Sequence, residues 1–167
     1  VWVGLIDRMH ITHYTLMNST LGEILLAGDA ESLSLVNFIE KSNTQYIEPH
    51  WLKSDSYFVE TINQLEQYFT GERQSFSIPV QVTGTKFQMD VIKELTQIPY
   101  GETCSYAELA KRIGHPRAHR AVGSANGRNP LPIIYPCHRV IASNGGLGGY
   151  SGGLKIKTAL LELESKN

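Results

Sequence analysis

Pro136-Cys137-His138-Arg139-Val140 puts a cysteine directly beside an imidazole and a guanidinium, at the end of an apolar run that a proline closes. The thiolate is the reactive form of cysteine, and neighbouring cations lower the thiol pKa from about 8.5. These five residues therefore predict a nucleophilic cysteine at position 137. The competing interpretation is a small, inert core residue, because most free cysteines in proteins are of that kind.

The residues on either side of this pentapeptide favour a functional site. Residues 129–135 are mostly apolar and predict a strand-like approach to the cysteine. Downstream, six of the nine residues in 145–153 are glycine. Glycine carries no Cβ atom, so the backbone of such a segment can come close to a ligand. We therefore expect a binding pocket beside Cys137.

The cysteine count argues against metal and disulfide chemistry. Cys104 and Cys137 are the only two cysteines, and they are far apart in the sequence. Neither belongs to a CxxC pair or lies near paired histidines, so no zinc-site spacing is present. Two cysteines also do not make a disulfide framework. The sequence predicts no metal site and a reducing, cytoplasmic location.

The formal net charge of −1 conceals an uneven distribution of charge. Residues 1–83 carry four basic against ten acidic residues, whereas residues 84–167 carry eleven basic against six acidic ones. Residues 111–157 contain eight Lys or Arg and no Asp or Glu. Such a stretch makes a local positive field that can neutralise phosphates. We expect it to bind nucleic acid; an ordinary solvated basic surface is the alternative.

The length of 167 residues allows one ordinary domain or two small ones. No apolar stretch approaches the ~18 residues that span a membrane. Residues 1–8 lack the basic start and long apolar centre of a signal peptide, and we expect them to be an upstream extension outside the fold. The change of composition at Gly84 predicts two domains, residues 9–83 and 84–167.

The first domain is expected to be a scaffold of strands and one helix. Residues 10–16, 23–27 and 32–39 predict an antiparallel meander, and residues 76–82 alternate as a further strand would. A helix capped by Ser54 or Asp55 and stopped at Gly71 carries four apolar residues at helical spacing: Phe58, Ile62, Leu65 and Phe69.

The second domain contains two capping-box patterns, Thr85-Lys86-Phe87-Gln88 and Ser105-Tyr106-Ala107-Glu108. The first predicts a helix that ends at Pro99, and the second predicts a short helix that stops at Gly114. A third helix is expected over residues 117–126 and a closing helix over residues 154–164, with Ile156, Leu160 and Leu163 as its apolar set. Two short helices joined by a tight turn predict a helix-turn-helix.

The third helix combines small residues with arginines. Its expected docking face consists of Ala118, Ala121, Val122 and Ala125. The remaining positions, on the helix and just beyond it, are Arg117, His119, Arg120, Gly123, Ser124 and Arg128. This composition suits a helix that approaches a nucleic-acid backbone or groove closely.

Together these motifs resemble the O6-alkylguanine-DNA alkyltransferases, also called methylated-DNA–protein-cysteine methyltransferases. Residues 129–140 and 145–153 are similar to the active-site segment of that family, NPxPIxxPCHRV followed by GxxGxYSGG. Further similarity lies in residues 19–27, 85–88, 105–110 and 120–123. The resemblance implies an α/β fold, with an N-terminal ribonuclease-H-like α/β domain and a C-terminal, mostly helical domain that contains a winged helix-turn-helix.

The resemblance also implies a reaction. Cys137 would irreversibly accept a methyl or alkyl group from O6 of guanine, and also from O4 of thymine, in a base flipped out of duplex DNA. His138 would act as its base through a water, Glu164 would orient that histidine, and Tyr106 would donate a proton to N3 of guanine. From spacing alone, Glu162 and Glu164 are equal candidates for the orienting carboxylate. The product is a thioether, which implies one turnover per molecule and no cofactor.

The same resemblance implies DNA-binding and supporting roles for other residues. Arg120 would fill the gap that the flipped nucleotide leaves, and Asn129 would brace the turn between the helix and the active site. Further DNA contacts would come from Arg117, Ala121, Gly123, Ser124 and Arg128. The base pocket would be formed or supported by Pro132, Val140, Tyr150 and Ser151. The implied partner is duplex DNA containing O6-alkylguanine, bound by a monomer.

Two other functions remain open on the sequence. Related alkyltransferase-like proteins bind damaged guanine but carry tryptophan at the cysteine position, so a non-catalytic damage sensor is the first alternative. The second is an unrelated hydrolase with a Cys-His pair, in which the base usually comes from a distant part of the chain. One departure from the family pattern is Tyr135, where an aliphatic residue usually precedes the PCHR motif.

Overall fold

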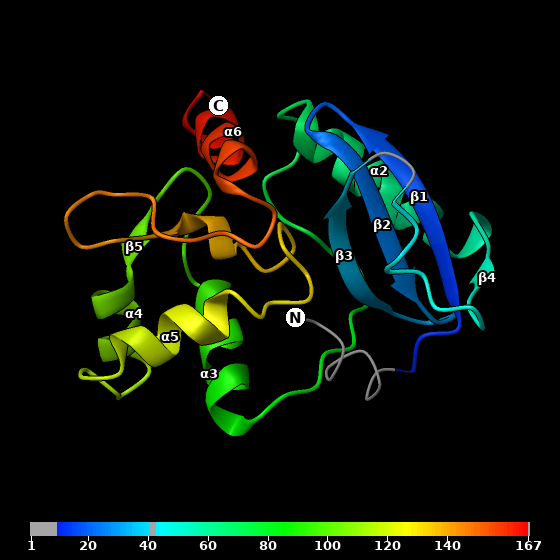
Figure 1. Ribbon diagram of the computed structural model, residues 1–167. Helices are drawn as coiled ribbons and strands as arrows, with labels where there is room; N and C mark the ends of the chain where they lie inside the picture. Colours follow the sequence, from blue (N-terminus) through cyan, green and yellow to red (C-terminus); the bar gives the residue numbers. More distant parts are fainter. Residues whose placement is uncertain (1–9, 41–42, 167) are drawn as a thin grey trace. The chain divides into compact units, whose positions relative to one another are not determined.

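The structure, a computed structural model, describes residues 10–40 and 43–166; the extension expected at residues 1–8 lies outside the described residues. The chain forms two compact units that divide between Thr83 and Gly84. Figure 1 shows the helices and strands of both units. Each unit has a hydrophobic core of its own.

A four-stranded sheet of order β3-β2-β1-β4 forms the centre of the first unit. Its strands are β1 (His13–Ser19), β2 (Gly22–Gly28), β3 (Leu33–Ile39) and β4 (Leu52–Lys53). The strands β1, β2 and β3 pair in antiparallel fashion, whereas β4 pairs with β1 in parallel. The predicted meander is therefore confirmed, although its first strand begins three residues later than expected and the short β4 was not predicted.

The helix α2 (Val59–Phe69) continues from a 3-10 turn, η1 (Ser56–Phe58), and contacts β1. Its buried residues are Thr61, Gln64, Leu65 and Tyr68. The predicted apolar set is thus partly wrong, because Ile62 and Phe69 are only half-buried. Of the two predicted caps, Asp55 occupies the N-cap position of η1, but it makes no capping bond, and its carboxylate accepts a hydrogen bond from Thr15 Oγ1 at 2.5 Å.

The strand predicted at residues 76–82 is absent from the first unit. Val80 makes an isolated parallel bridge with Leu33, closed by Leu33 N donating to Pro79 O and Gln81 N donating to Leu33 O. Pro79 has no N–H group and cannot extend a ladder of hydrogen bonds. The alternating sequence therefore belongs to an extended segment that touches β3 at one point.

The second unit is mostly helical. Its elements are α3 (Lys86–Leu95), β5 (Cys104–Ser105), α4 (Tyr106–Arg112), α5 (His119–Asn126), η2 (Cys137–Arg139), β6 (Val140–Ile141) and α6 (Leu154–Ser165). The strands β5 and β6 form a two-stranded parallel sheet. At α3 the predicted capping box is complete, with Gln88 N donating to Thr85 Oγ1 and Thr85 N donating to Gln88 Oε1.

The helices α4 and α5 form the predicted pair of short helices joined by a tight turn (Figure 1). Gly114 ends α4 with φ of 78°, a left-handed conformation that favours glycine. The helix α5 begins at His119, because Arg117 lies in the turn before it. Of the predicted docking face, Val122 and Ala125 are buried but Ala121 is exposed, so the face that packs on the domain is narrower than expected.

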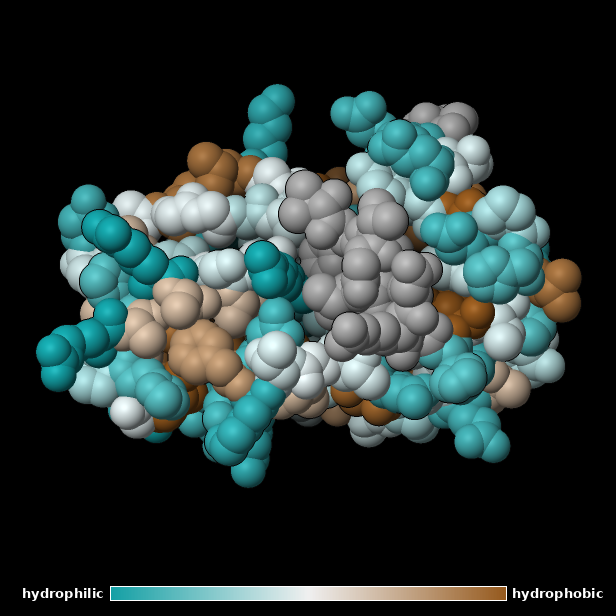
Figure 2. Space-filling view, turned by 60° about the horizontal axis from the view of Figure 1, so that its bottom comes forward, coloured by the Kyte–Doolittle hydropathy of each residue, from teal (hydrophilic) through white to brown (hydrophobic). Residues whose placement is uncertain are grey.

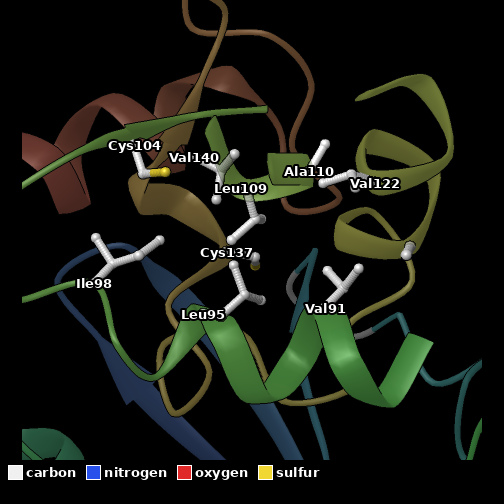
Figure 3. Packing of buried hydrophobic residues seen from close by; sticks show 10 residues of the cluster. Val91, Leu95, Ile98, Cys104, Leu109, Ala110, Val122, Cys137 and Val140 are labelled. Carbon is white, nitrogen blue, oxygen red and sulfur yellow. The ribbon is translucent and has the colours of Figure 1, made fainter. Parts of the chain in front are cut away.

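The core of the second unit is built around Cys137. Figure 3 shows this side chain among Leu95 of α3, Leu109 of α4 and neighbouring residues. The helix α6 closes the unit by burying Lys157, Leu160 and Glu164. The predicted apolar set of this helix is therefore wrong at Ile156 and Leu163, which are only half-buried. Two charged side chains point inward instead.

Candidate active site

Cys137 opens the 3-10 turn η2 and is 2% exposed. Its backbone N–H donates to Tyr135 O at 2.7 Å, and its carbonyl accepts from Asn126 Nδ2 at 3.2 Å. The first contact comes from the loop before the cysteine and the second from helix α5. The backbone of the thiol-bearing residue is thus held from two directions.

The loop that leads to Cys137 is compact and not a strand, so the strand-like approach predicted for residues 129–135 is wrong. Asn129 braces this loop, with Nδ2 donating to Tyr135 O at 2.7 Å and Oδ1 accepting from Leu131 N at 3.0 Å. Ile133 has φ of 75°, which is rare for a β-branched residue. Two prolines in residues 129–135 and a third at position 136 supply no N–H group for a ladder, which explains the loop.

The Glu164 carboxylate binds the two side chains that follow the cysteine, those of His138 and Arg139. His138 Nε2 donates to Glu164 Oε1 at 2.7 Å. Arg139 makes two bonds to the same carboxylate, Nε to Oε2 at 2.8 Å and Nη2 to Oε1 at 2.9 Å, and its Nη1 donates to Ile98 O at 2.6 Å. All three side chains are buried, whereas Glu162 is exposed. Between the two carboxylates that spacing left open, Glu164 is the one beside His138.

This arrangement overturns the expectation that His138 and Arg139 lower the pKa of the neighbouring thiol. Both side chains bind Glu164, and burial raises the pKa of Cys137 to about 11. A hydrogen bond from Asn129 and the charge of Lys157 act in the opposite direction but do not outweigh burial. Burial also lowers the pKa of His138, against the effect of Glu164. The imidazole is therefore neutral near pH 7, and because Nε2–H faces the carboxylate, its lone pair is on Nδ1.

Lys157 is a buried residue that the sequence analysis missed. Its ammonium donates to Val140 O at 2.6 Å, to Gly149 O at 3.2 Å and to Leu147 O. Burial lowers its pKa to about 8, although the charge of Cys137 acts in the opposite direction. The side chain therefore ties the glycine-rich loop to β6. Its position three residues before Leu160 and seven before Glu164, on the buried face of α6, is the signal that could have found it.

A pocket of about 450 Å³ lies over helix α5; Cys137 does not line it, but two of its lining residues, Tyr106 and Tyr150, pack against the core cluster that contains the cysteine. Five residues that the sequence predicted for the site line it, namely Tyr106, Arg120, Gly123, Tyr150 and Ser151. Four further residues line it that were not singled out as site residues: His119, Asn126, Gly127 and, from the glycine-rich segment expected near a ligand, Gly149. Gly148 makes room for this wall, because a Cβ atom there would lie 2.7 Å from the Tyr106 hydroxyl.

The two tyrosines of the pocket face the thiol. Burial, and then the charge of Cys137, raises the pKa of Tyr106 and raises that of Tyr150 further. Both phenols are therefore protonated at neutral pH. The Tyr106 hydroxyl points at Gly149 O at a long 3.5 Å, and both rings pack against the core cluster that contains Cys137.

The other predicted site residues lie outside the pocket lining. Pro132 and Val140 are buried in the core behind it. The side chains of Arg117, Ala121, Ser124 and Arg128 are exposed. At the left of Figure 2, where the second unit is seen, hydrophilic side chains project around a small patch of hydrophobic colour. Tyr135, the departure from the family pattern, is half-buried against the same core as Cys137.

The described residues contain neither a metal-binding cluster nor a membrane-spanning helix. Within 10–40 and 43–166 there is no group of three or more His, Cys, Asp or Glu side chains that could hold a metal ion. In the same part of the chain, no helix is long and apolar enough to cross a membrane.

A buried Cys-His-Glu cluster close to a pocket on a pair of short helices is the arrangement expected of a DNA-binding protein that uses a cysteine. Family models agree with this class. The ribonuclease-like domain of 6-O-methylguanine DNA methyltransferase matches residues 12–82, and the DNA-binding domain of the same family matches residues 86–166. The chain belongs to the 6-O-methylguanine DNA methyltransferase family, as its motifs predicted.

Individual relatives cover nearly the whole chain. A methylated-DNA–protein-cysteine methyltransferase of Methanosarcina acetivorans is 50% identical over 91% of this chain and 97% of its own. The crystal structure of Mycobacterium tuberculosis O6-methylguanine methyltransferase has a TM-score of 0.84 at 46% identity and covers 92% of this chain and 93% of that one. Mycobacterium tuberculosis OGT in complex with DNA gives 0.86 at 45% identity, over 93% and 94%. The predicted fold class is confirmed.

Replacing Glu164 by glutamine is expected to destabilise the protein by about 3 kcal/mol, because it leaves the buried Arg139 guanidinium without its ionic partner. Urea unfolding would measure this loss. The exposed Glu162→Gln variant is the matched control and should change stability by less than about 0.5 kcal/mol. Equal effects of the two substitutions would contradict the assigned network.

The raised pKa of Cys137 predicts a distinctive pH dependence of its reaction with iodoacetamide. Only the thiolate reacts, so below a pKa of about 11 the rate should rise about tenfold per pH unit from pH 7 to about pH 10. Peptide mass spectrometry distinguishes Cys137 from Cys104, and glutathione serves as the reference thiol. A rate that reaches its plateau near pH 8 would show that burial does not control this group.

Proposed function

We propose that this protein repairs alkylated DNA by direct reversal, moving a methyl or alkyl group from O6 of guanine to the sulfur of Cys137. The observation that carries the proposal is a buried thiol, adjacent to a neutral His138 bound to Glu164, next to a pocket on helix α5. The relatives that cover nearly the whole chain are named as methylated-DNA–protein-cysteine methyltransferases, which supports the same activity.

The proposed transfer is an in-line displacement at the alkyl carbon. Cys137 loses its proton to His138 Nδ1 through a water, and the thiolate forms the new S–C bond. The C–O6 bond breaks, and its electron pair stays on the guanine, which takes a proton at N3 from Tyr106. The proton that His138 took from the thiol returns through water to the Tyr106 tyrosinate, and the N3 proton of the released base exchanges through solvent to N1, so the products are a thioether on Cys137 and an unmodified guanine. Each molecule acts once, because the proposed mechanism includes no step that removes the alkyl group.

The shifted pKa values of Cys137, His138 and Tyr106 support these roles. A thiol with a pKa of about 11 is almost entirely protonated at neutral pH, so a base is required. A neutral histidine beside a carboxylate is a suitable base, since Glu164 stabilises the imidazolium that forms. A tyrosine whose pKa is raised keeps the proton that the departing guanine needs.

The proposed substrate is duplex DNA, with the damaged nucleotide flipped into the pocket. The reacting carbon is inside the base stack, and extruding a base costs a few kcal/mol. Arg120 is exposed and lines the pocket, so its side chain is in a position to occupy the vacated space. The exposed Arg117 and Arg128 flank it in sequence and can bind phosphates.

The proposal extends to O4-alkylthymine, which presents the same type of alkyl ether to the thiolate. It also includes a monomer that works in the cytoplasm, where reducing conditions keep the thiol free. The damage-sensor alternative is less favoured, because the chain carries Cys137 at the position where the sensors have tryptophan.

A Cys137→Ser variant is expected to abolish transfer and to retain binding to a duplex that contains O6-methylguanine. Intact-protein and peptide mass spectrometry should show the mass of one methylene group added to the Cys137 peptide of the unmodified protein and no addition to the variant. Transfer by Cys137→Ser would refute the nucleophile assignment. Tight, lesion-selective binding without mass gain in the unmodified protein would indicate a damage sensor.

An Arg120→Ala variant should slow transfer from duplex DNA by about tenfold or more, because it loses the side chain that offsets the cost of base extrusion. Transfer from a single-stranded oligonucleotide should change little, since no stacked partner strand is disturbed. Arg73→Ala removes the same charge from the first unit and is the control. Equal slowing on both substrates would contradict a role in flipping.

A further inference from the structure

The pocket over helix α5 follows the whole length of that helix. The residues of α5 and of its C-cap that line it are His119, Arg120, Gly123, Asn126 and Gly127, which share one face of the helix. His119 is the first residue of α5 and Asn126 is the last. At a rise of 1.5 Å per residue, these two positions lie about 10 Å apart along the helix axis. The two ends of the pocket are therefore separate places.

The two ends differ in their surroundings. At the C-terminal end of α5, Asn126 Nδ2 donates to the carbonyl of Cys137 at 3.2 Å, so this end lies nearer the nucleophile. At the N-terminal end, the pocket is lined by His119 and Arg120, and both side chains are exposed. The pocket therefore runs from the residue that carries the thiol to a pair of side chains that can donate hydrogen bonds to an anion.

The imidazole of His119 is not engaged within the described part of the protein: no hydrogen bond or ion pair there involves it. The helices α3 and α4 contact α5, and their carboxylates are paired with Lys86 or Arg112. Residues 111–157, which include α5 and the glycine-rich wall of the pocket, contain no Asp or Glu. An anion at this end of the pocket would therefore meet N–H donors and no carboxylate from these elements.

We propose that His119 binds a phosphate of the extruded nucleotide and so holds that nucleotide in the pocket while its base reacts at the other end. This inference rests on the function proposed above. In a nucleotide, O6 of guanine and the phosphates lie at opposite ends with the sugar between them, as Asn126 and His119 do in the pocket. An imidazole always offers at least one N–H donor, and phosphate oxygens accept.

The position of His119 distinguishes it from the arginines near it. Arg117 and Arg128 do not line the pocket, so the phosphates within their reach belong to neighbouring nucleotides. Arg120 lines the pocket, but its proposed place is the space that the extruded base vacates. His119 is the remaining donor at this end of α5 that faces the pocket interior. Its contact would form only after the nucleotide has left the duplex stack.

The test is single-turnover methyl transfer from an O6-methylguanine duplex in which one phosphate flanking the lesion, on its 5′ or its 3′ side, is replaced by an uncharged methylphosphonate. With the unmodified protein, one of the two replacements should slow transfer about tenfold, because it removes the charge of the acceptor. His119→Ala should slow transfer from the native duplex to a similar extent, and the same replacement should then cost less than about twofold. His115→Ala alters an exposed histidine that does not line the pocket, and it should keep the full methylphosphonate effect.

Two further substitutions separate a phosphate contact from stacking. His119→Lys keeps a donor for phosphate and should restore both the rate and the methylphosphonate effect, whereas His119→Phe keeps a flat ring and should behave like His119→Ala. Restoration by phenylalanine alone would overturn the inference. A methylphosphonate effect that is absent from the unmodified protein, or equally large in His119→Ala, would overturn it as well. Failure of the unmodified protein to accept a methyl group from the native duplex would instead refute the proposed function.

Discussion

The bidentate ion pair between Arg139 and Glu164 is the interaction on which the site depends. It is buried, so it survives only because the carboxylate also binds His138 and Gly101 N and the guanidinium also binds Ile98 O. These contacts connect α6, η2 and the segment after α3. An ion pair inside a protein contributes little net stability compared with apolar packing, but it specifies one arrangement of the elements that carry it. Here that arrangement fixes the imidazole with Nε2 on the carboxylate.

Packing and reactivity oppose each other at Cys137. The residue behaves as part of the core, among Leu95 and Leu109, and this burial raises its thiol pKa (Figure 3). The charged groups nearest the site are instead Glu164, which binds the neutral His138, and Lys157, which binds backbone carbonyls. A resting protein of this design reacts slowly with adventitious electrophiles.

The sequence predicted features that depend on local residue patterns. It did not predict features that depend on which way a helix or side chain points in the folded structure. The capping box at Thr85 is a local pattern, and it identified the start of α3 correctly. Spacing could not choose between Glu162 and Glu164, since that choice requires the direction in which α6 packs. The sign of the thiol pKa shift was wrong for the same reason, because adjacency in sequence does not make Arg139 a neighbour of the sulfur. Lys157 was missed because a lysine is ordinarily read as a surface residue.

The anchoring of the glycine-rich loop by Lys157 has an evolutionary consequence. All three acceptors of this ammonium, in Val140, Leu147 and Gly149, are backbone carbonyls. Side chains in the loop can therefore be exchanged without loss of the anchor, provided that the path of the main chain is kept. A change in the number of loop residues would move these carbonyls away from the ammonium, whereas a change of side chain leaves the carbonyls in place. We expect related sequences to vary at loop positions other than Gly148, where a Cβ atom would meet the Tyr106 hydroxyl, and to retain both the number of loop residues and Lys157.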